Sequence, residues 1–539
     1  MAAIALLDQI KYQAGRLAHI GGIYPERIPD RLNVRPVDPW RGDAEKGASL
    51  CTAAGASEQD GPVWFEQWWE PEDADAVWLD HMHGFQWLRD LRMMGGALAR
   101  AQGRLMIQNW IETYPNPDKT AWQSDLTGQR LSMWISHYEY FCAGADEYFE
   151  DLFFASLIRQ ARHLQASLGS VREVKSLQAI KGLIYAGVAL EGHAHWVSQG
   201  LRALEKDLAR QILTDGGHIS RSPEKLLEAL QASLDIQAAL AAGDADVPCF
   251  LRDSIMRMAT AVRFFRYGDR KFGVFHGAQE GSASEIDTVL AQAGARGRIP
   301  QSLPCTGFER MSLGRSLVML DTGRAPEYPF DADAHASPLG FEFCYGKERV
   351  LVSCGAHPTS APWNAALRST AAHNTACIDQ RDACEIRKDG HFGRKVTRMA
   401  LDRQESAEAI LVEAAHNGYM PLNGILHTRK LYLGDEGNDL RGEDDFASAA
   451  PLVRSVEIAL RFHLHPDVSV SLINNNTEAL LRIPGGVGWR FHFGHGALLL
   501  EDSIYLGSGI TPRKTKQLVI YGQMSGEFSC VKWSLKREG

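Results

Sequence analysis

The sequence predicts an α-helical domain followed by an antiparallel β-sandwich. Over the first 290 or so residues, apolar side chains recur at three- and four-residue spacing, which is typical of amphipathic helices. From Leu303 onward, short runs recur at roughly ten- to fifteen-residue intervals with Gly, Asp and Asn between them, as in antiparallel sandwiches. The pattern of apolar residues changes from helical spacing to short strand-like runs near Gly273. We therefore expect a helical domain over residues 1–290 and a sandwich over 291–539.

The helical pattern favours a toroid or incomplete barrel over a four-helix bundle, because several long amphipathic segments follow one another with short connections. The clearest segments are Leu79–Ile111, Glu147–Leu168, Val174–Leu190, His195–Leu213 and Pro223–Leu240. Ser222 and Pro223 suit an N-cap and a first helical position, respectively.

The sandwich half is predicted from short β-like runs bounded by turn residues. They include Ser316–Gly323, Gly340–Gly346, Glu408–Tyr419, His427–Asp435, Val456–Pro466, Gln517–Gln523 and Phe528–Leu535. KFGVFHG (Lys271–Gly277) has the same alternation, and the segment Gln279–Pro304 is expected to hold the boundary. Two histidine-bearing runs, AHASPLGFEF and LRSTAAHNTACID, are also expected in β-structure.

Composition narrows the function classes. The chain has 57 Lys and Arg against 66 Asp and Glu, a net charge of −9, which argues against a general nucleic-acid binder but allows a local basic groove for an acidic glycan. Its nine cysteines are dispersed without a CxxC pair, which favours reduced thiols. No apolar run approaches the roughly 20 residues of a membrane span. The N-terminus lacks signal-peptide features, so we expect a cytoplasmic protein, with the periplasm as the alternative.

Tryptophan is concentrated in the helical half, which holds ten of the thirteen before residue 200. Most are expected in the core. The run WFEQWW (Trp64–Trp69) is denser than a core needs, so Trp68 and Trp69 are candidates for stacking on sugar rings in a cleft.

A series of motifs resembles a known family. In order they are HGFQWLRDLR, LIYAG, DGGHISRSPE, AHASPLGFEF, RVLVSCG, LRSTAAHNTACID, HNGYMPLNGILHTRKLYL, ALRFHLHPDVSV and PRKTKQLVIYG. Their order resembles the heparinase II/III-like polysaccharide lyases over most of the chain from about residue 80. The resemblance implies an α/α toroid followed by a β-sandwich. It also implies β-elimination on a uronic-acid-containing polysaccharide.

That reaction needs a group that neutralises the carboxylate, a base for the neighbouring proton and an acid for the leaving oxygen. The candidate catalytic residues are His218, Arg221, His335, His373 and Tyr419. The candidate substrate-binding residues are Lys175, Lys225, Asp333, His416, Trp68 and Trp69. Because the histidine motifs come from both halves, we expect a cleft between the domains. His218 and Arg221 should then lie within ~10–12 Å of His373.

The sequence departs from the pattern that the resemblance implies. Members commonly carry Asn-His where Val174 and Lys175 stand, and Tyr where Lys225 stands. They carry a catalytic His where Asp333 stands, and a metal-binding Asp where Ser353 stands; His335 matches the family's structural metal ligand. A stable zinc site wants three or four protein ligands. We therefore expect no cofactor, with a structural metal on His335 and His373 as the weaker alternative.

Structural roles compete with these functional ones. His218 could cap a helix, Arg221 could pair with an acid, and His335 and His373 could be buried, hydrogen-bonded histidines. The HLH run at 463–465 and the HFGH run at 492–495 are expected to be polar strand residues without a metal.

Three functions stay open: a lyase on an acidic glycan, a non-catalytic glycan-binding protein with a degenerate site, and a glycosidase. The glycosidase needs two carboxylates roughly 5–10 Å apart, and no convincing pair surrounds Asp333. The identity of the glycan, exo or endo action and the oligomeric state are open as well.

Overall fold

The computed structural model describes residues 28–57, 68–72, 74–142 and 144–538, and the chain separates into two compact units. Unit 1 runs to Arg210 and resumes over Glu228–Ile255; unit 2 comprises Gln211–Leu227 and Met256–Gly539. The division expected at residue 290 is based on the change from helical to strand patterns in the sequence. The packing instead groups the DGGHISRSPE run with the sheets, so this motif belongs to unit 2.

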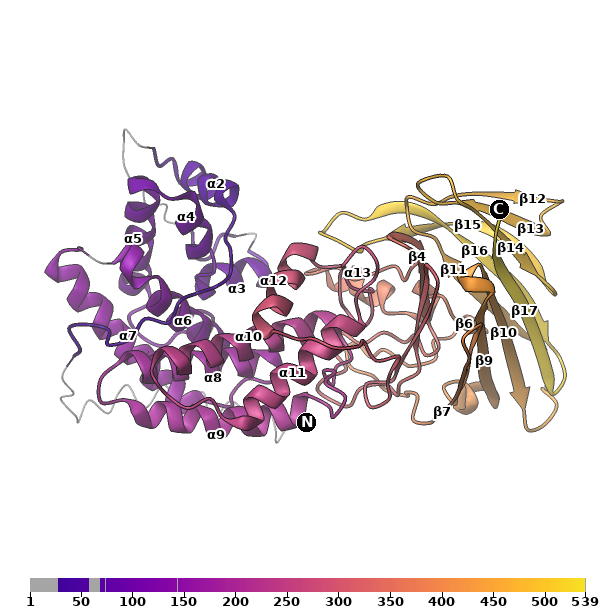
Figure 1. The fold of residues 1–539 in the computed structure, drawn as a ribbon, viewed down its shortest axis with the longest axis horizontal. Helices are drawn as coiled ribbons and strands as arrows, with labels where there is room; N and C mark the ends of the chain where they lie inside the picture. The colour runs from indigo at the N-terminus through magenta and orange to yellow at the C-terminus, as the bar shows by residue number, and fades with distance from the viewer. Residues whose placement is uncertain (1–27, 58–67, 73, 143, 539) are drawn as a thin grey trace. The chain divides into compact units, whose positions relative to one another are not determined.

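Helices make up the first part of the chain (Figure 1). They are α2 (Ala44–Ala54), α3 (Ala76–Gly84), α4 (Leu88–Met94), α5 (Gly96–Thr113), α6 (Ser124–Phe141), α7 (Glu147–Ser167), α8 (Val174–Ala189), α9 (Ala194–Gln211), α10 (Pro223–Ala242), α11 (Cys249–Phe264) and α12 (Ala283–Ala293). Among the residues that the structure describes, no helix is both long enough and apolar enough to cross a membrane.

The single helix expected over Leu79–Ile111 is wrong, because the chain breaks there into α3, α4 and α5. Phe85 ends α3 with a φ of 60°, and Gly95 ends α4 with a φ of 74°. A left-handed residue cannot continue a right-handed helix, so each break redirects the chain. The apolar spacing survived these breaks, which is why periodicity alone did not reveal them.

Unit 1 owes its tight packing to small side chains and buried indoles. A Cβ on Gly182 of α8 would lie 2.3 Å from the Cα atom of Gly128 in α6, so only glycine lets the two helices approach this closely. The core of unit 1 also buries Trp87, Trp110 and Trp134 almost completely. These three tryptophans are therefore packing residues of the core, as expected.

The boundary segment contains more structure than expected. Helix α12 lies inside it, with Ser282 as N-cap: the Ser282 hydroxyl accepts a hydrogen bond from the Glu285 amide. The strand-like run Lys271–Gly277 is not a strand; it forms one isolated bridge and a loop that carries His276. The alternation of residue types in Lys271–Gly277 therefore belongs to a loop and not to a strand.

Three antiparallel sheets form the rest of unit 2. The five-stranded sheet has the order β1 (Ser302–Leu303), β2 (Phe308–Leu313), β3 (Ser316–Asp321), β4 (Phe341–Tyr345) and β5 (Glu348–Leu351). The eight-stranded sheet has the order β12 (Ser469–Ile473), β13 (Glu478–Arg482), β14 (Gly488–Phe493), β17 (Phe528–Arg537), β10 (Asp439–Ser448), β9 (Ile425–Gly434), β8 (Ile410–His416) and β7 (Met399–Glu405). The four-stranded sheet has the order β15 (Ala497–Tyr505), β16 (Arg513–Met524), β11 (Val456–His463) and β6 (Ala376–Ile378).

The sandwich core lies between these sheets and is rich in aromatic rings. The Trp533 ring of β17 stacks on Phe341 of β4 at 5.5 Å between centroids, and Phe462 of β11 meets it edge-on at 4.9 Å. Three strands from three sheets therefore share one ring cluster. The predicted fold class, an α/α toroid followed by an antiparallel β-sandwich, is confirmed.

The two histidine runs are only partly β-structure. Strand β4 begins at Phe341, several residues after His335, which lies in an irregular segment. His373 follows a single 3-10 turn, η1 (Thr370–Ala372), and precedes β6. Both histidines therefore lie in irregular segments outside the strands, where the backbone is not constrained by sheet pairing.

Candidate functional site

Arg221 is a buried clamp that ties the DGGHISRSPE loop to the five-stranded sheet. Its Nε donates to the carbonyl oxygen of Thr306 at 2.7 Å, and its Nη2 donates to the carbonyl of Gly307 at 2.9 Å. The same Nη2 also donates to Asp321 at the end of β3. The guanidinium lies over the Phe308 ring at 4.8 Å. This fork of donors uses the geometry that distinguishes Arg from Lys. The acid partner expected from a helix thus comes instead from strand β3.

Asp321 and His276 extend this clamp. His276 Nε2 donates to Asp321 Oδ2 at 3.0 Å, while His276 Nδ1 accepts from the amide of His335 at 3.1 Å. Burial works to raise the pKa of Asp321, but Arg221 and His276 outweigh it and hold that pKa at about 2. Burial lowers the pKa of His276. In the sequence these two residues stand in DTG and FHG, which resemble ordinary turns and do not by themselves indicate a function.

His335 and His373 lie ring to ring, with centroids 4.5 Å apart. His335 Nδ1 accepts from the amide of His276 at 3.2 Å, and its Nε2 faces the amide of Gly277 at 2.9 Å. Burial lowers the pKa of His335 well below its ordinary value and that of His373 to about 3. His373 Nε2 has no hydrogen-bond partner among the described residues. Both rings are therefore neutral near pH 7.

These residues do not fit the structural metal considered from the sequence. A metal ligand needs a nitrogen lone pair directed at the ion, but both ring nitrogens of His335 face backbone N–H groups. Ser353, which stands where a carboxylate is expected, offers a buried hydroxyl without a partner in the described part of the chain. A neutral hydroxyl is a poor substitute for an anionic oxygen ligand.

Both ring nitrogens of His218 contact polar side chains nearby in the sequence. Its Nδ1 lies 2.7 Å from the Ser220 hydroxyl and its Nε2 lies 3.1 Å from Gln211 Oε1. Burial, and then the charge of Lys225, lowers the pKa of His218 to about 3. One ring nitrogen is thus engaged by Ser220 of the same loop and the other by Gln211 at the end of α9.

Lys225 and Asp333 pair with one another. Lys225 Nζ lies 2.6 Å from Asp333 Oδ2, and the lysine side chain is mostly buried while the aspartate is half-exposed. Burial works to raise the pKa of Asp333, but Lys225 outweighs it and the pKa is lowered. The resemblance expects a tyrosine and a histidine at these two positions. The two departures from the family pattern thus neutralise each other within unit 2.

Lys175, in unit 1, is paired in the same way. Its Nζ lies 2.9 Å from Asp125 Oδ2 and 3.6 Å from Asp80 Oδ2. Burial works to lower the pKa of Lys175, but the two carboxylates outweigh it and the pKa is raised. Lys175 is therefore a charged member of an ion cluster and not a lysine primed as a base.

Tyr419 and His416 lie in the core of unit 2. The Tyr419 hydroxyl donates to the carbonyl of Ala376 at 2.8 Å, and burial raises its pKa well above the ordinary value. His416 Nε2 lies 3.0 Å from His427 Nδ1, and His427 Nε2 lies 2.8 Å from Asp444 Oδ1. Neither predicted role, proton transfer by Tyr419 or substrate binding by His416, is supported, because both side chains are fully buried and already bonded.

Trp68 and Trp69 are also buried in the unit 1 core. The Trp69 ring stacks against His83 at 5.9 Å and Phe85 at 5.6 Å, and its Nε1 donates to Asn109 Oδ1 at 2.9 Å. Rings packed in this way offer no face to a sugar, so these two candidates are corrected to core residues. Trp64 lies outside the described residues.

The candidate residues therefore divide into separate groups. Arg221, Asp321, His276, His335 and His373 form one chain of contacts within unit 2. Lys225 and Asp333 form a second group beside it, since Gly277 packs against Asp333. The interdomain cleft and the expected separation of His218 from His373 stay predictions.

Comparisons with known proteins identify relatives along nearly the whole chain. The family model described as "Heparinase II/III N-terminus" matches residues 99–295, and "Heparinase II/III-like, C-terminal" matches residues 295–534. The FtsZ-localized protein C of Caulobacter vibrioides is 29% identical over 95% of this chain and 91% of that protein.

Two solved structures show the same fold. A heparinase III crystal structure aligns with a TM-score of 0.73 at 15% identity, covering 98% of this chain and 89% of that one. A mutant of the heparan sulfate lyase HepC from Pedobacter heparinus aligns with a TM-score of 0.68 at 13% identity, covering 99% and 88%. At these identities the similarity concerns the fold alone.

Proposed function

This chain belongs to the heparinase II/III-like family, and on that premise we propose that it is a binding protein built on a polysaccharide lyase fold rather than a lyase. The observation that carries the proposal is the ion pair between Lys225 and Asp333. It occupies the two positions at which the family resemblance implies a tyrosine and a histidine for proton transfer.

The remaining groups give little support to β-elimination. The reaction needs a base and an acid that reach the substrate and exchange protons near pH 7. His218 and His373 have pKa values of about 3 because they are buried, and the hydroxyl of Tyr419 is bonded inside the core. The ammonium of Lys225 is already paired with the Asp333 carboxylate, which makes Lys225 a poor candidate for the base.

The first test is a direct assay for cleavage. We expect the purified full-length protein, incubated with a panel of uronic-acid glycans, to give no unsaturated product, which would absorb near roughly 232 nm. A known heparinase III on the same panel is the positive control. A reproducible rise in absorbance would refute the non-catalytic proposal.

The FtsZ-localized relative suggests where such a binding protein acts. Its match covers nearly the full length of both chains, so the likeness includes helical and sheet parts alike. We propose that this chain also gathers where FtsZ assembles. A functional fluorescent fusion of the full-length protein should form a midcell band that coincides with labelled FtsZ and disperses when FtsZ is depleted. A fusion that stays diffuse, or a band that persists without FtsZ, would contradict this part of the proposal.

A lyase acting on an acidic glycan is the second candidate. Its support is His373, whose Nε2 has no partner among the described residues and which lies against the ring of His335. If the cleavage assay gives product, the variant His373→Ala should abolish turnover while its melting temperature stays near that of the parent. A proportional loss of folded protein and activity would instead make His373 a core residue.

A further inference from the structure

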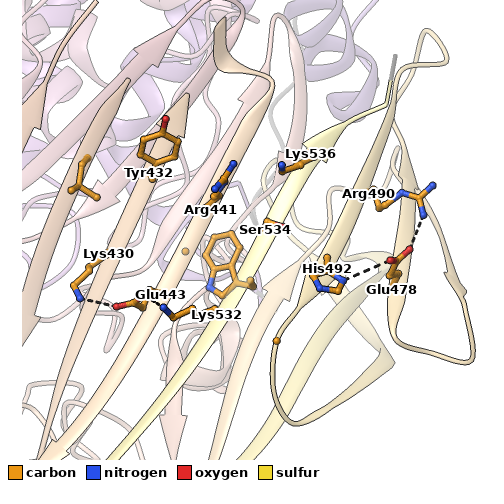
Figure 2. A pocket seen from close by; sticks show the side chains of 14 residues that line it. Lys430, Tyr432, Arg441, Glu443, Glu478, Arg490, His492, Lys532, Ser534 and Lys536 are labelled. Carbon is orange, nitrogen blue, oxygen red and sulfur yellow. Dashed lines mark hydrogen bonds and ion pairs between the residues drawn. The ribbon is translucent and has the colours of Figure 1, made fainter. Parts of the chain in front are cut away.

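The outer face of the eight-stranded sheet has a hollow of about 840 Å³ (Figure 2). Its walls come from alternate, outward-pointing side chains of β8, β9, β10, β13, β14 and β17. The strand register aligns Lys430, Glu443 and Lys532 in one row across three strands. Tyr432, Arg441 and Ser534 form the neighbouring row. The hollow lies wholly in unit 2 and shares no residue with the Arg221 and Lys225 groups.

The charges in this hollow are layered. Glu443 accepts from Lys430 at 2.7 Å and from Lys532 at 2.8 Å, and Arg441 pairs with Asp439 at 2.5 Å. The Lys532 and Arg441 side chains are 69% and 56% exposed, whereas those of Glu443 and Asp439 are only 26% and 7% exposed. The cations therefore reach into solvent while their carboxylates stay near the sheet. A ligand that enters meets positive charge first.

Two further features shape the hollow. Arg441 lies over the Tyr432 ring at 5.7 Å, and Figure 2 shows both projecting from neighbouring strands beside Lys536. On β10, directly after Arg441, Gly442 has no side chain; a Cβ there would lie 2.1 Å from the Trp533 ring. The floor therefore consists of backbone over a buried indole, flanked by an aromatic ring and charged groups.

We propose that this hollow is a binding site for an acidic oligosaccharide, a glycan whose rings carry both carboxylates and hydroxyls. The exposed cations of Lys532, Arg441 and Lys536 suit the carboxylates. The recessed carboxylate of Glu443, together with Glu478 at the far wall, can accept hydrogen bonds from sugar hydroxyls, which a ligand of pure negative charge could not use. The Tyr432 ring adds an apolar face for a sugar ring.

An acidic peptide fits the hollow less well. Strands β9, β10 and β17 are each hydrogen-bonded on both sides, so a peptide cannot add to them as a further strand. The wall also offers few apolar anchors, chiefly Leu411 and the Tyr432 ring. The inference goes beyond the proposed function, which assigns no surface to the protein. A chain that neither cleaves glycans nor follows FtsZ could still bind here.

The test is binding of defined hexasaccharides to the full-length protein by calorimetry. The probes are hexamers of galacturonate, of mannuronate and from hyaluronan, with fully methyl-esterified galacturonate as the uncharged match. We expect at least one acidic hexamer to bind and esterification to abolish the binding. The double variant Arg441→Ala/Lys532→Ala should weaken binding by at least about tenfold, the effect of one lost charge-assisted contact.

Lys516→Ala supplies the matched control. Lys516 is a half-exposed strand lysine on β16, paired with Asp502 at 2.6 Å, but it belongs to the four-stranded sheet. Its removal should leave affinity unchanged. Binding by none of the acidic hexamers, or an equal loss in the control variant, overturns the inference. So does competition by poly-L-glutamate at equal charge, which would mean that the hollow recognises charge alone. The comparison with the esterified hexamer needs no variant, so a misfolded mutant cannot hide the answer.

Discussion

Acidification from pH 7.5 to pH 5 is expected to lower the free energy of unfolding by about 4 kcal/mol. The reason is a set of buried histidines, of which His218 and His373 have pKa values of about 3 and His463 has one of about 4. In the unfolded chain a histidine titrates near 6.5. Below that pH the unfolded state takes up protons that the folded state refuses, so folding becomes less favourable.

The direction follows from the sign of the shift. A group whose pKa is depressed on folding contributes stability that is present above its unfolded pKa and is lost as the pH falls toward its folded pKa. For His218 and His373 that window runs from about 6.5 down to about 3. Each costs up to ~1.4 kcal/mol per pH unit within it. Together they remove about 4 kcal/mol by pH 5, which is a large share of the stability of many domains.

Urea denaturation at pH 7.5, 6 and 5 measures this dependence, with the midpoint expected to fall at each step. His218→Gln should reduce the slope against pH even if it lowers stability at pH 7.5, because glutamine does not titrate. The exposed His495 is the matched control: His495→Gln should leave the slope unchanged. A midpoint that stays constant between pH 7.5 and pH 5 would show that these rings are not buried in neutral form.

Replacement of Arg221 by methionine is expected to destabilise the protein by about 3–5 kcal/mol, the usual effect of removing one partner from a buried ion pair. The change leaves Asp321 charged inside the protein and leaves the carbonyl of Thr306 without its donor. The carbonyl of Gly307 loses one donor but keeps the amide of Thr322. Arg221→Lys should recover only part of the loss, because an ammonium cannot reproduce the planar fork of donors.

Equilibrium unfolding of the full-length variants measures these losses. Arg513 offers the comparison, since it pairs with Asp467 at 2.6 Å but both side chains are about half-exposed. Arg513→Met should change stability by no more than about 1 kcal/mol. If Arg221→Met is as stable as the parent, Arg221 is not the clamp described above, and a role in ligand binding regains weight.

Local regularities in the sequence predicted the elements well. The segment expected as Glu147–Leu168 is α7 (Glu147–Ser167), and the proline predicted to open a helix is the first residue of α10. Helix periodicity and capping are set by residues within one or two turns of each other, so they can be read along the chain. Breaks such as Phe85 escape this approach, because a single left-handed residue leaves the apolar spacing almost intact.

The candidate site was harder to predict, because its residues acquire their roles only from distant partners. The HNGY run suggests Tyr419 as an acid or base, but the carbonyl that accepts from its hydroxyl belongs to Ala376 on β6. Nothing near Asp321 in the sequence indicates its role, since that role depends on Arg221 and His276 from other segments. Sequence identifies residue types capable of chemistry, whereas burial and pairing decide their protonation, and both depend on the tertiary fold.

The pair of Lys225 and Asp333 also constrains how this chain can change. Replacing Lys225 alone by tyrosine would leave the Asp333 carboxylate without its partner, and replacing Asp333 alone by histidine would leave a mostly buried ammonium without its counter-ion. Each single replacement toward the family pattern is therefore expected to destabilise the protein, although the two together need not. The two positions are coupled, so a variant that tests the family pattern at this site has to change both residues at once.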